Sequence, residues 1–566
     1  MVLVYDRRMA THGLTRKEFL VRAMGAALGA AVGGPAWAAG ATNGVAQTPG
    51  QLSLDDLRGF ARVVGIEFTE AELKEVLRDV QGELPGLQDL RRVTDDQTLP
   101  PATSFRVRGL RDHPNPRVDV RVPTPSHTIR PSSDDDLLFL TIPELGTLLR
   151  RGEVSSLELT RVAIARLQRF GEPLHCVVEL TADRALREAR RADEELESGY
   201  DRGPLHGIPY GLKDLFAVRG TRTQWGTAAY RHQRIPEDSA VYERLREAGA
   251  VLVAKLSLGA LAMNDVWFGG MTRNPWNPAE GSSGSSAGSA SSVAAGLLPF
   301  AIGTETSGSI VSPTHRCRVT GLRPTFGRVS RYGAMSLAWS MDKVGPIART
   351  AEDALLVLAA LVGVDARDAA TISQPLVYRR PRSLRGLRVG ISGDAPKEVV
   401  EQLHRAGVTT APFRAPATPG ALGAIIGVES AAMFDKITRD GRLKEVTENE
   451  WPQFFRAARF TGAVEYAQCD RLRGRLMEQW ATAAERFDCL LANDTAAAWI
   501  YALNLIGWPQ VLVPRGPSAQ GKGQSVSLVG PPLSEPRLVG VAAHLQAAFG
   551  AHRLRPDLTS LTPGPG

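Results

Sequence analysis

The chain has only four cysteines among its 566 residues, and their spacing argues against two kinds of site. No CxxC pair, zinc-finger spacing or HExxH motif is present. The sequence therefore predicts neither a disulfide framework nor a metal site, and we expect no cofactor. The cysteines are Cys176, Cys317, Cys469 and Cys489.

Lysine is also scarce, since nine of the 67 Lys and Arg residues are lysines and 58 are arginines. An arginine keeps its proton in a protein, so any step that needs a neutral amine depends on one of the nine lysines. The net charge of +7 falls to +4 without residues 1–38, which carry five basic and two acidic residues (7 − 3 = 4). No stripe of basic residues alternates with aromatic ones, so we expect no nucleic-acid partner.

Beyond the N-terminal segment, no apolar run approaches the ~20 residues that a membrane span needs. The N-terminus itself has TRKEFL at 15–20, an uncharged run at 23–36 and a small-x-small site at Ala36-Trp37-Ala38. It resembles a twin-arginine export signal with Lys in place of the second Arg. We therefore expect residues 1–38 to be an export signal and the protein to be periplasmic or extracellular. A frayed N-terminal helix is the alternative.

The next segment, 39–136, is expected to be a small extension that precedes the main domain. Apolar residues recur at three- and four-residue steps over 52–92, which predicts helices. Five prolines then fall within 112–136, which is typical of a linker or of a segment that lies over the surface. The extension either covers a pocket mouth or mediates formation of a homodimer, and the sequence does not decide between them.

Residues 137–560 have the pattern of one large α/β domain. Ser155-x-x-Glu158 predicts a helix that begins with a capping box. Helical segments such as 240–250 then alternate with short apolar strand candidates. These strand candidates lie at 251–256, 387–392 and 511–514.

Residues 280–296, EGSSGSSAGSASSVAAG, have the composition of a flexible linker but also supply seven hydroxyl groups. One reading is the GxSxG turn of α/β-hydrolases, with Ser286 as the nucleophile. That turn needs a strand directly before it, and Pro275 and Pro278 exclude a central strand there. An HGGG-type oxyanion motif is also absent upstream. The sequence therefore argues against the α/β-hydrolase reading.

The blocks around this stretch carry a second interpretation. PLHGIPYGLKDLF at 204–216, NPWNPAEGSSGSSAGS at 274–289 and the block from AAGLLPFAIGTETSGSIVSP onward, at 294–350, occur in order. Together they resemble the amidase signature family over roughly residues 137–550. The resemblance implies a single large α/β/α domain around a mixed, twisted sheet.

The family's catalytic residues can be carried over one by one. Its base falls on Lys213, its bridging serine on Ser285 and its nucleophile on Ser309. The resemblance also implies a cis peptide bond at Gly284-Ser285. Its oxyanion hole would consist of the backbone N–H groups of Thr306, Ser307, Gly308 and Ser309.

The chemistry of these residue types agrees with those roles. Lys213 lies between Leu212 and the apolar pair Leu215-Phe216, and burial disfavours the ammonium form, so its amine can act as a base. Ser285 can relay a proton because a hydroxyl both donates and accepts. Consecutive N–H groups before Ser309 can stabilise the oxyanion of a tetrahedral intermediate.

The sequence departs from the family pattern near the predicted nucleophile. Glu305 and Ser307 replace the usual Asp and Gly, and Val311 replaces an arginine. These changes leave the three catalytic groups intact but alter the surroundings of the substrate.

We therefore expect a serine amidohydrolase that cleaves the C–N bond of a small-molecule amide through an acyl-enzyme. One alternative is a glutaminase like the glutaminase subunit of the glutamyl-tRNA amidotransferase, against which the export signal argues. Another is a catalytically silent binding protein that keeps the amidase fold.

Overall fold

The computed structural model describes residues 52–94, 103, 116–125, 127–518 and 523–561. The predicted export signal at 1–38 lies outside the described residues. The chain divides into two compact units. Of the described residues, the smaller unit comprises 52–94, 417–439 and 452–473, and the larger one comprises 103, 116–125, 127–416, 440–451, 474–518 and 523–561.

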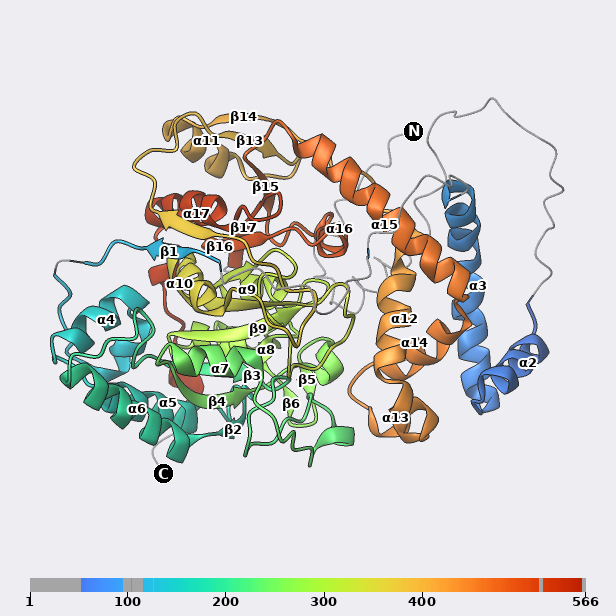
Figure 1. Cartoon of the computed structure of the whole chain (residues 1–566), viewed down its shortest axis with the longest axis horizontal. Coiled ribbons are helices and arrows are strands. Elements are labelled where there is room, and N and C mark those ends of the chain that lie inside the picture. Colours follow the sequence, from blue (N-terminus) through green and yellow to red (C-terminus); the bar gives the residue numbers. More distant parts are fainter. Residues whose placement is uncertain (1–51, 95–102, 104–115, 126, 519–522, 562–566) are drawn as a thin grey trace. The chain divides into compact units, whose positions relative to one another are not determined.

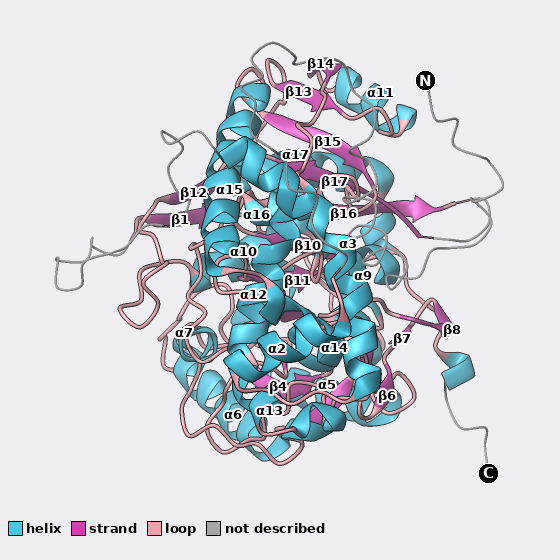
Figure 2. Cartoon of the chain, turned by 90° about the vertical axis from the view of Figure 1, so that its right-hand side faces the viewer, coloured by secondary structure: helices cyan, strands magenta, loops and turns pink. Residues whose placement is uncertain are grey.

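The larger unit is built on an 11-stranded mixed sheet (Figure 1). The strand order is β14-β13-β15-β17-β16-β10-β11-β9-β3-β4-β2, and Figure 2 shows this succession from β14 at one end toward β4 at the other. The strands span β2 Val177–Leu180, β3 Pro209–Lys213, β4 Val251–Leu256, β9 Phe300–Glu305, β10 Thr320–Arg323, β11 Lys343–Ala348, β13 Arg388–Ile391, β14 Thr409–Pro412, β15 Cys489–Asn493, β16 Gln510–Pro517 and β17 Gly523–Val529.

Parallel and antiparallel pairs are both present in this sheet. β3 runs parallel to both β4 and β9, whereas β9 pairs antiparallel with β11. β3, β4 and β11 are buried along their whole length, as expected for strands of a sheet covered on both faces. The predicted α/β class with a mixed sheet is therefore confirmed.

Three two-stranded pairs lie outside the large sheet. They are β1 (Val118–Arg121) with β12 (Leu376–Arg379), β5 (Val266–Trp267) with β6 (Gly270–Met271), and β7 (Arg273–Asn274) with β8 (Asn277–Gly281). β1 lies within 112–136, which the sequence predicts to be a linker or a segment over the surface. It pairs in parallel with β12. The β7–β8 ribbon accommodates Pro278 because it is not part of the central sheet.

Helices pack against the sheet of the larger unit. α6 contacts β4, α8 contacts β9 and β3, α10 contacts β11, and α17 contacts β16. Their bounds are α4 Ile142–Arg150, α5 Ser156–Phe170, α6 Ala182–Glu197, α7 Ala240–Glu247, α8 Ala287–Ala294, α9 Val311–Cys317, α10 Ala351–Leu361, α11 Lys397–Arg405, α16 Ile500–Leu505 and α17 Glu535–Phe549.

The predicted capping box of α5 is only half formed. The Ser155 hydroxyl accepts a hydrogen bond from the Glu158 N–H at 3.0 Å. The Glu158 carboxylate accepts from the Arg130 guanidinium, a stronger, charged donor. The prediction was therefore right about where the helix begins and wrong about the partner of Glu158.

The smaller unit is helical. α2 (Leu54–Val64) and α3 (Glu70–Thr94) occupy the segment for which the sequence predicts helices. Leu57, Leu73, Val76 and Val80 form its core. Residues 417–439 and 452–473, which fall inside the predicted 137–560 domain, cluster with these helices. Its other helices are α12 Gly423–Met433, α13 Asp435–Arg439, most of α14 (Trp451–Ala457) and the first part of α15 (Ala463–Ala484).

None of the helices in the described part of the chain is both long and apolar enough to cross a bilayer.

Candidate active site

Lys213 is the last residue of β3 and is fully buried. Its Nζ lies 2.9 Å from Ser285 Oγ, 3.1 Å from Ser286 Oγ and 2.9 Å from Thr304 Oγ1. Each of these hydroxyls can accept a hydrogen bond from the amine or donate one to it. The structure thus brings together Lys213 and Ser285, two of the predicted catalytic residues, which are 72 positions apart in the sequence.

Ser285 follows a cis peptide bond from Gly284, as the family resemblance implies. A Cβ on residue 284 would lie 1.9 Å from the carbonyl oxygen of Asn264, so only glycine fits there. Before it, the Ser283 N–H donates to Asp265 Oδ2 at 2.7 Å. Contacts with residues 264 and 265 therefore hold the backbone that presents Ser285.

Ser286 links the two serine segments. Its N–H donates to the carbonyl oxygen of Ser309 at 3.1 Å, and its side-chain oxygen accepts from the Thr304 N–H at 3.1 Å. Ser286 then begins α8 as its N-cap residue. It is thus placed to support Lys213 and Ser309, and no strand directly precedes it as the α/β-hydrolase turn requires.

Ser309 lies in the turn between β9 and α9, with 2% of its surface exposed. Gly308 has φ 96°, and a Cβ there would lie 2.7 Å from Ile500 Cδ1. The helix N-cap residue is Ile310, so Ser309 does not have the capping role that a serine after glycine commonly takes. The predicted oxyanion residues Thr306, Ser307 and Gly308 occupy this same turn.

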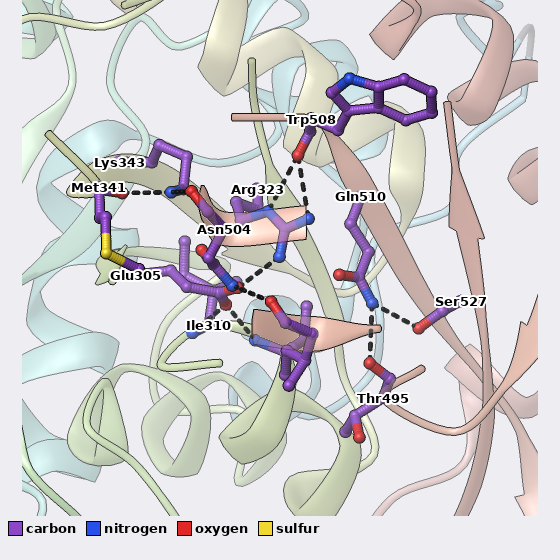
Figure 3. Close-up of polar contacts among 12 residues, drawn as sticks. Glu305, Ile310, Arg323, Met341, Lys343, Thr495, Asn504, Trp508, Gln510 and Ser527 are labelled. Carbon is purple, nitrogen blue, oxygen red and sulfur yellow. Dashed lines mark hydrogen bonds and ion pairs between the residues drawn. The ribbon is translucent and has the colours of Figure 1, made fainter. Parts of the chain in front are cut away.

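Glu305 holds this turn through hydrogen bonds to its carboxylate (Figure 3). Its Oε2 accepts from the N–H groups of Ile310 at 2.8 Å and Val311 at 3.0 Å. Its Oε1 accepts from Arg323 Nη1 at 2.6 Å and Asn504 Nδ2 at 2.9 Å. Burial alone would raise the pKa of Glu305, but the Arg323 guanidinium and the hydrogen bonds lower it to about 2.

A second buried carboxylate supports the oxyanion segment. Asp342 Oδ1 accepts from the Thr306 hydroxyl at 2.6 Å, and Oδ2 accepts from the N–H groups of Leu337 and Ala338. Burial raises the pKa of Asp342 despite these bonds. Asp342 therefore ties the predicted oxyanion segment to the neighbouring loop.

The residue after the predicted base belongs to a separate buried ion pair. Asp214 Oδ1 lies 2.7 Å from Lys255 Nζ, and both side chains are fully buried. Lys255 also donates to the Arg222 carbonyl oxygen at 3.0 Å. This agrees with a structural role for Lys255, because its charge is matched by a carboxylate.

A small cavity lies beside these groups in the larger unit. Thr304, which contacts Lys213, and Thr306, from the predicted oxyanion segment, are both in its wall. The charged residues in the wall already bind protein groups. Arg331 pairs with Asp368 at 2.9 Å, Lys343 Nζ donates to the Met341 carbonyl oxygen, and Asp342 accepts from Thr306. The other lining residues are Leu215, Ala262, Ala334, Met335, Ser336, Leu337 and Val344.

Comparison with known proteins identifies the family. A family model described as Amidase matches residues 158–491. The chain belongs to the amidase signature family. This member of the family is an enzyme, a hydrolase that acts on carbon–nitrogen bonds.

This amidase matches several known proteins over almost their whole length. It is 33% identical over 482 residues to a subunit of the glutamyl-tRNA(Gln) amidotransferase of Methylococcus capsulatus, across 74% of this chain and 98% of that protein. Among solved structures it is similar to the native peptide amidase from Stenotrophomonas maltophilia, with 31% identity, a TM-score of 0.66, and coverage of 74% and 98%. It is also similar to a 6-aminohexanoate cyclic dimer hydrolase, with 25% identity, a TM-score of 0.64, and coverage of 74% and 99%.

Sequence reasoning missed several residues of the site. It considered Ser286 only as a rival nucleophile, although its adjacency to Ser285 could have indicated a shared role. Thr304 and Asp342 carry no local signal, because their contacts depend on which strands the fold places side by side. Glu305 stood out in the sequence only as a departure from the family, and its clamp on the turn is visible in the structure alone.

Proposed function

We propose that this amidase hydrolyses a small-molecule carboxamide through an acyl-enzyme on Ser309, with Ser285 as proton relay and Lys213 as base. The observation that supports this most is the 2.9 Å contact between Lys213 Nζ and Ser285 Oγ in a fully buried setting. A neutral amine there can accept the Ser285 proton. The tie between Ser286 N–H and the Ser309 carbonyl keeps the relay segment beside the nucleophile turn.

In the first half of the reaction, Ser309 Oγ attacks the amide carbon. Its proton passes to Ser285 Oγ while the Ser285 proton passes to Lys213 Nζ, so the amine becomes an ammonium. The carbonyl oxygen becomes an oxyanion next to the N–H groups of residues 306–309. The proton then returns through Ser285 to the departing nitrogen, the C–N bond breaks, and an ester on Ser309 remains.

In the second half, water attacks this ester. Its proton follows the same route to Lys213, and the returned proton goes to Ser309 Oγ as the acid leaves. The same relay therefore serves both halves, and Lys213 ends each half unprotonated.

The cavity suggests which amides fit. Its wall combines apolar side chains with hydroxyls and three charged groups. The cations are engaged by Asp368 and by the Met341 carbonyl oxygen, and the Asp342 carboxylate is engaged by Thr306 and Leu337. An ionised substrate group would have to compete with these contacts and lose its hydration. We therefore propose an uncharged, mainly apolar acyl group.

A fluorophosphonate probe tests the mechanism, because it phosphonylates an activated serine with loss of fluoride. We expect labelling of the peptide that contains Ser309, and loss of labelling in Ser309→Ala. Labelling at Ser286 instead would support the α/β-hydrolase reading. If no amide, ester or peptide forms an acyl-enzyme, a silent binding protein becomes the better interpretation.

The similarity to subunits of glutamyl-tRNA(Gln) amidotransferases favours a second candidate, a glutaminase that works in a complex. Glutamine hydrolysis and co-purifying partner subunits would support it. We propose export instead, on the sequence of residues 1–38, and a mature protein whose mass lacks that segment would support export.

A further inference from the structure

Residues 440–451, here called the strap, belong to the larger unit although the segments on both sides of them in the sequence belong to the smaller one. The strap binds two loops of the larger unit. Glu448 accepts from the Ala228 N–H at 3.1 Å, and Arg442 donates to the Ala229 carbonyl oxygen at 2.7 Å. These bonds anchor the strap to the first loop, which contains the short 3-10 helix Ala228–Tyr230.

The second loop comprises residues 258–264, here called the cavity loop. Asn449 Nδ2 donates to the Ala260 carbonyl oxygen at 2.7 Å. The indole Nε1 of Trp451 donates to the Leu261 carbonyl oxygen at 2.9 Å, and Trp451 itself is buried. The strap therefore supplies side-chain donors to two successive carbonyl groups of the cavity loop.

The cavity loop has a backbone that needs such support. Leu261, Ala262 and Asn264 have φ values of 48°, 64° and 58°, in the left-handed region that residues with a side chain seldom occupy. Conformations of this kind persist where surrounding contacts hold them. The bonds from Asn449 and Trp451 are contacts of that kind.

Both the cavity that we propose for the acyl group and the segment of Ser285 touch the cavity loop. Ala262 is part of the cavity wall. The Asn264 carbonyl oxygen lies against Gly284, directly before Ser285. A shift of the loop would therefore move the wall that faces the substrate, and it would press on the backbone that presents the relay serine.

We propose that Asn449 and Trp451 are positioning residues that set the cavity wall at Ala262 and thereby the selectivity for the acyl group. This inference rests on the proposed function. Neither residue lines the cavity, so each acts through the loop. Loss of either donor leaves a loop carbonyl group without that hydrogen bond and lets the wall relax, which weakens binding more than it slows chemistry.

Trp451→Phe tests this, because phenylalanine keeps most of the buried ring but lacks the N–H donor. Trp276→Phe is the matched control, since its indole donates to the Cys317 carbonyl oxygen at 2.8 Å and does not line the cavity. The assay is saturation labelling with ethyl and hexyl fluorophosphonates, which yields the inhibition constant KI and the maximal rate kinact separately.

We expect Trp451→Phe to raise KI for the hexyl probe about threefold to tenfold, the effect of one lost hydrogen bond. KI for the ethyl probe and kinact for both probes should change less than about twofold. Trp276→Phe should leave the hexyl-to-ethyl ratio unchanged. Equal ratios in the wild type and Trp451→Phe would overturn the proposal.

Asn449→Ala provides a second variant if Trp451→Phe does not fold, and it should shift the same ratio. Hydrogen exchange gives a readout that needs no activity, since amides of residues 258–266 should exchange faster in either variant than in Trp276→Phe. If both strap variants unfold, the residues serve stability and the positioning role is wrong. A wild-type protein that no probe labels at Ser309 would refute the proposed function instead.

Discussion

Replacing Glu305 by glutamine removes one buried negative charge without a large change of shape. The carboxylate accepts from four donors, which are Ile310 N, Val311 N, Arg323 Nη1 and Asn504 Nδ2. Glutamine must turn its NH2 group toward one pair of these donors, and it leaves the fully buried Arg323 without a counter-charge. The variant therefore combines a repulsive contact with an unpaired cation.

Two independent arguments give a similar loss of unfolding free energy for this variant. The pKa of Glu305 falls from its ordinary value of 4.5 to about 2 in the folded protein. At about 1.4 kcal/mol per tenfold change, that fall corresponds to about 3 kcal/mol of stability. Breaking a buried ion pair by removing one partner typically costs about 3–5 kcal/mol. We therefore expect Glu305→Gln to lower the free energy of unfolding by about 3 kcal/mol at pH 7.

The pH dependence gives the sign of this effect. Because the folded pKa is lowered, the carboxylate stabilises the protein fully above pH 4.5 and loses that contribution as the pH falls toward 2. The wild type and Glu305→Gln should thus differ most near neutral pH, and the difference should shrink below pH 4.5. Urea unfolding followed by tryptophan fluorescence measures it at each pH.

The same variant should also slow labelling of Ser309 by a fluorophosphonate, because Glu305 holds the N–H groups of Ile310 and Val311, the two residues that follow Ser309. The double variant Glu305→Leu with Arg323→Met removes both charges and should recover much of the stability but little of the labelling. A loss below about 1 kcal/mol for Glu305→Gln, with labelling at the wild-type rate, would refute the reasoning.

Three further changes probe other contacts of the site. Gly284→Ala places a Cβ 1.9 Å from the Asn264 carbonyl oxygen and should reduce serine labelling at least about 100-fold, whereas unchanged labelling would contradict the close fit. Asp214→Asn leaves Lys255 buried without its carboxylate partner and should lower the free energy of unfolding in urea by about 3–5 kcal/mol. The double variant Asp214→Asn with Lys255→Met should lose less than Asp214→Asn alone, and the opposite order would contradict this. Thr304→Val removes one hydroxyl contact of Lys213, the proposed base, and should lower kcat about tenfold with KM unchanged; Thr304→Ser should restore kcat.

The sequence predicts the local features of this fold well. The apolar run at 251–256 forms β4 with the predicted bounds, and the helix expected at 240–250 is α7. Such elements depend on residues that are neighbours in the chain. Ser155 likewise accepts from the Glu158 N–H at the predicted helix start, but the partner of the Glu158 carboxylate, Arg130, lies 28 residues away and was missed.

Contacts between distant residues could not be predicted in the same way. The motifs suggest Lys213 and Ser285 as a pair, yet only the parallel register of β3 with β9 brings Thr304 to the same amine. The grouping of residues 417–439 and 452–473 with the N-terminal helices also depends on tertiary contacts. Neither periodicity nor composition contains that information.

The three buried lysines of the described chain show why the proposed base falls on Lys213. Lys255 forms a fully buried ion pair with the Asp214 carboxylate. Lys343 donates to the carbonyl oxygens of Met341 and Asn504, which can accept a hydrogen bond but cannot donate one. Lys213 meets hydroxyl groups, which can do both, so its amine can lose its proton and keep hydrogen-bond partners. Arginine cannot lose its proton in a protein, so a neutral amine must come from one of the few lysines of this chain. The hydroxyl groups around Lys213 suit that form of the side chain.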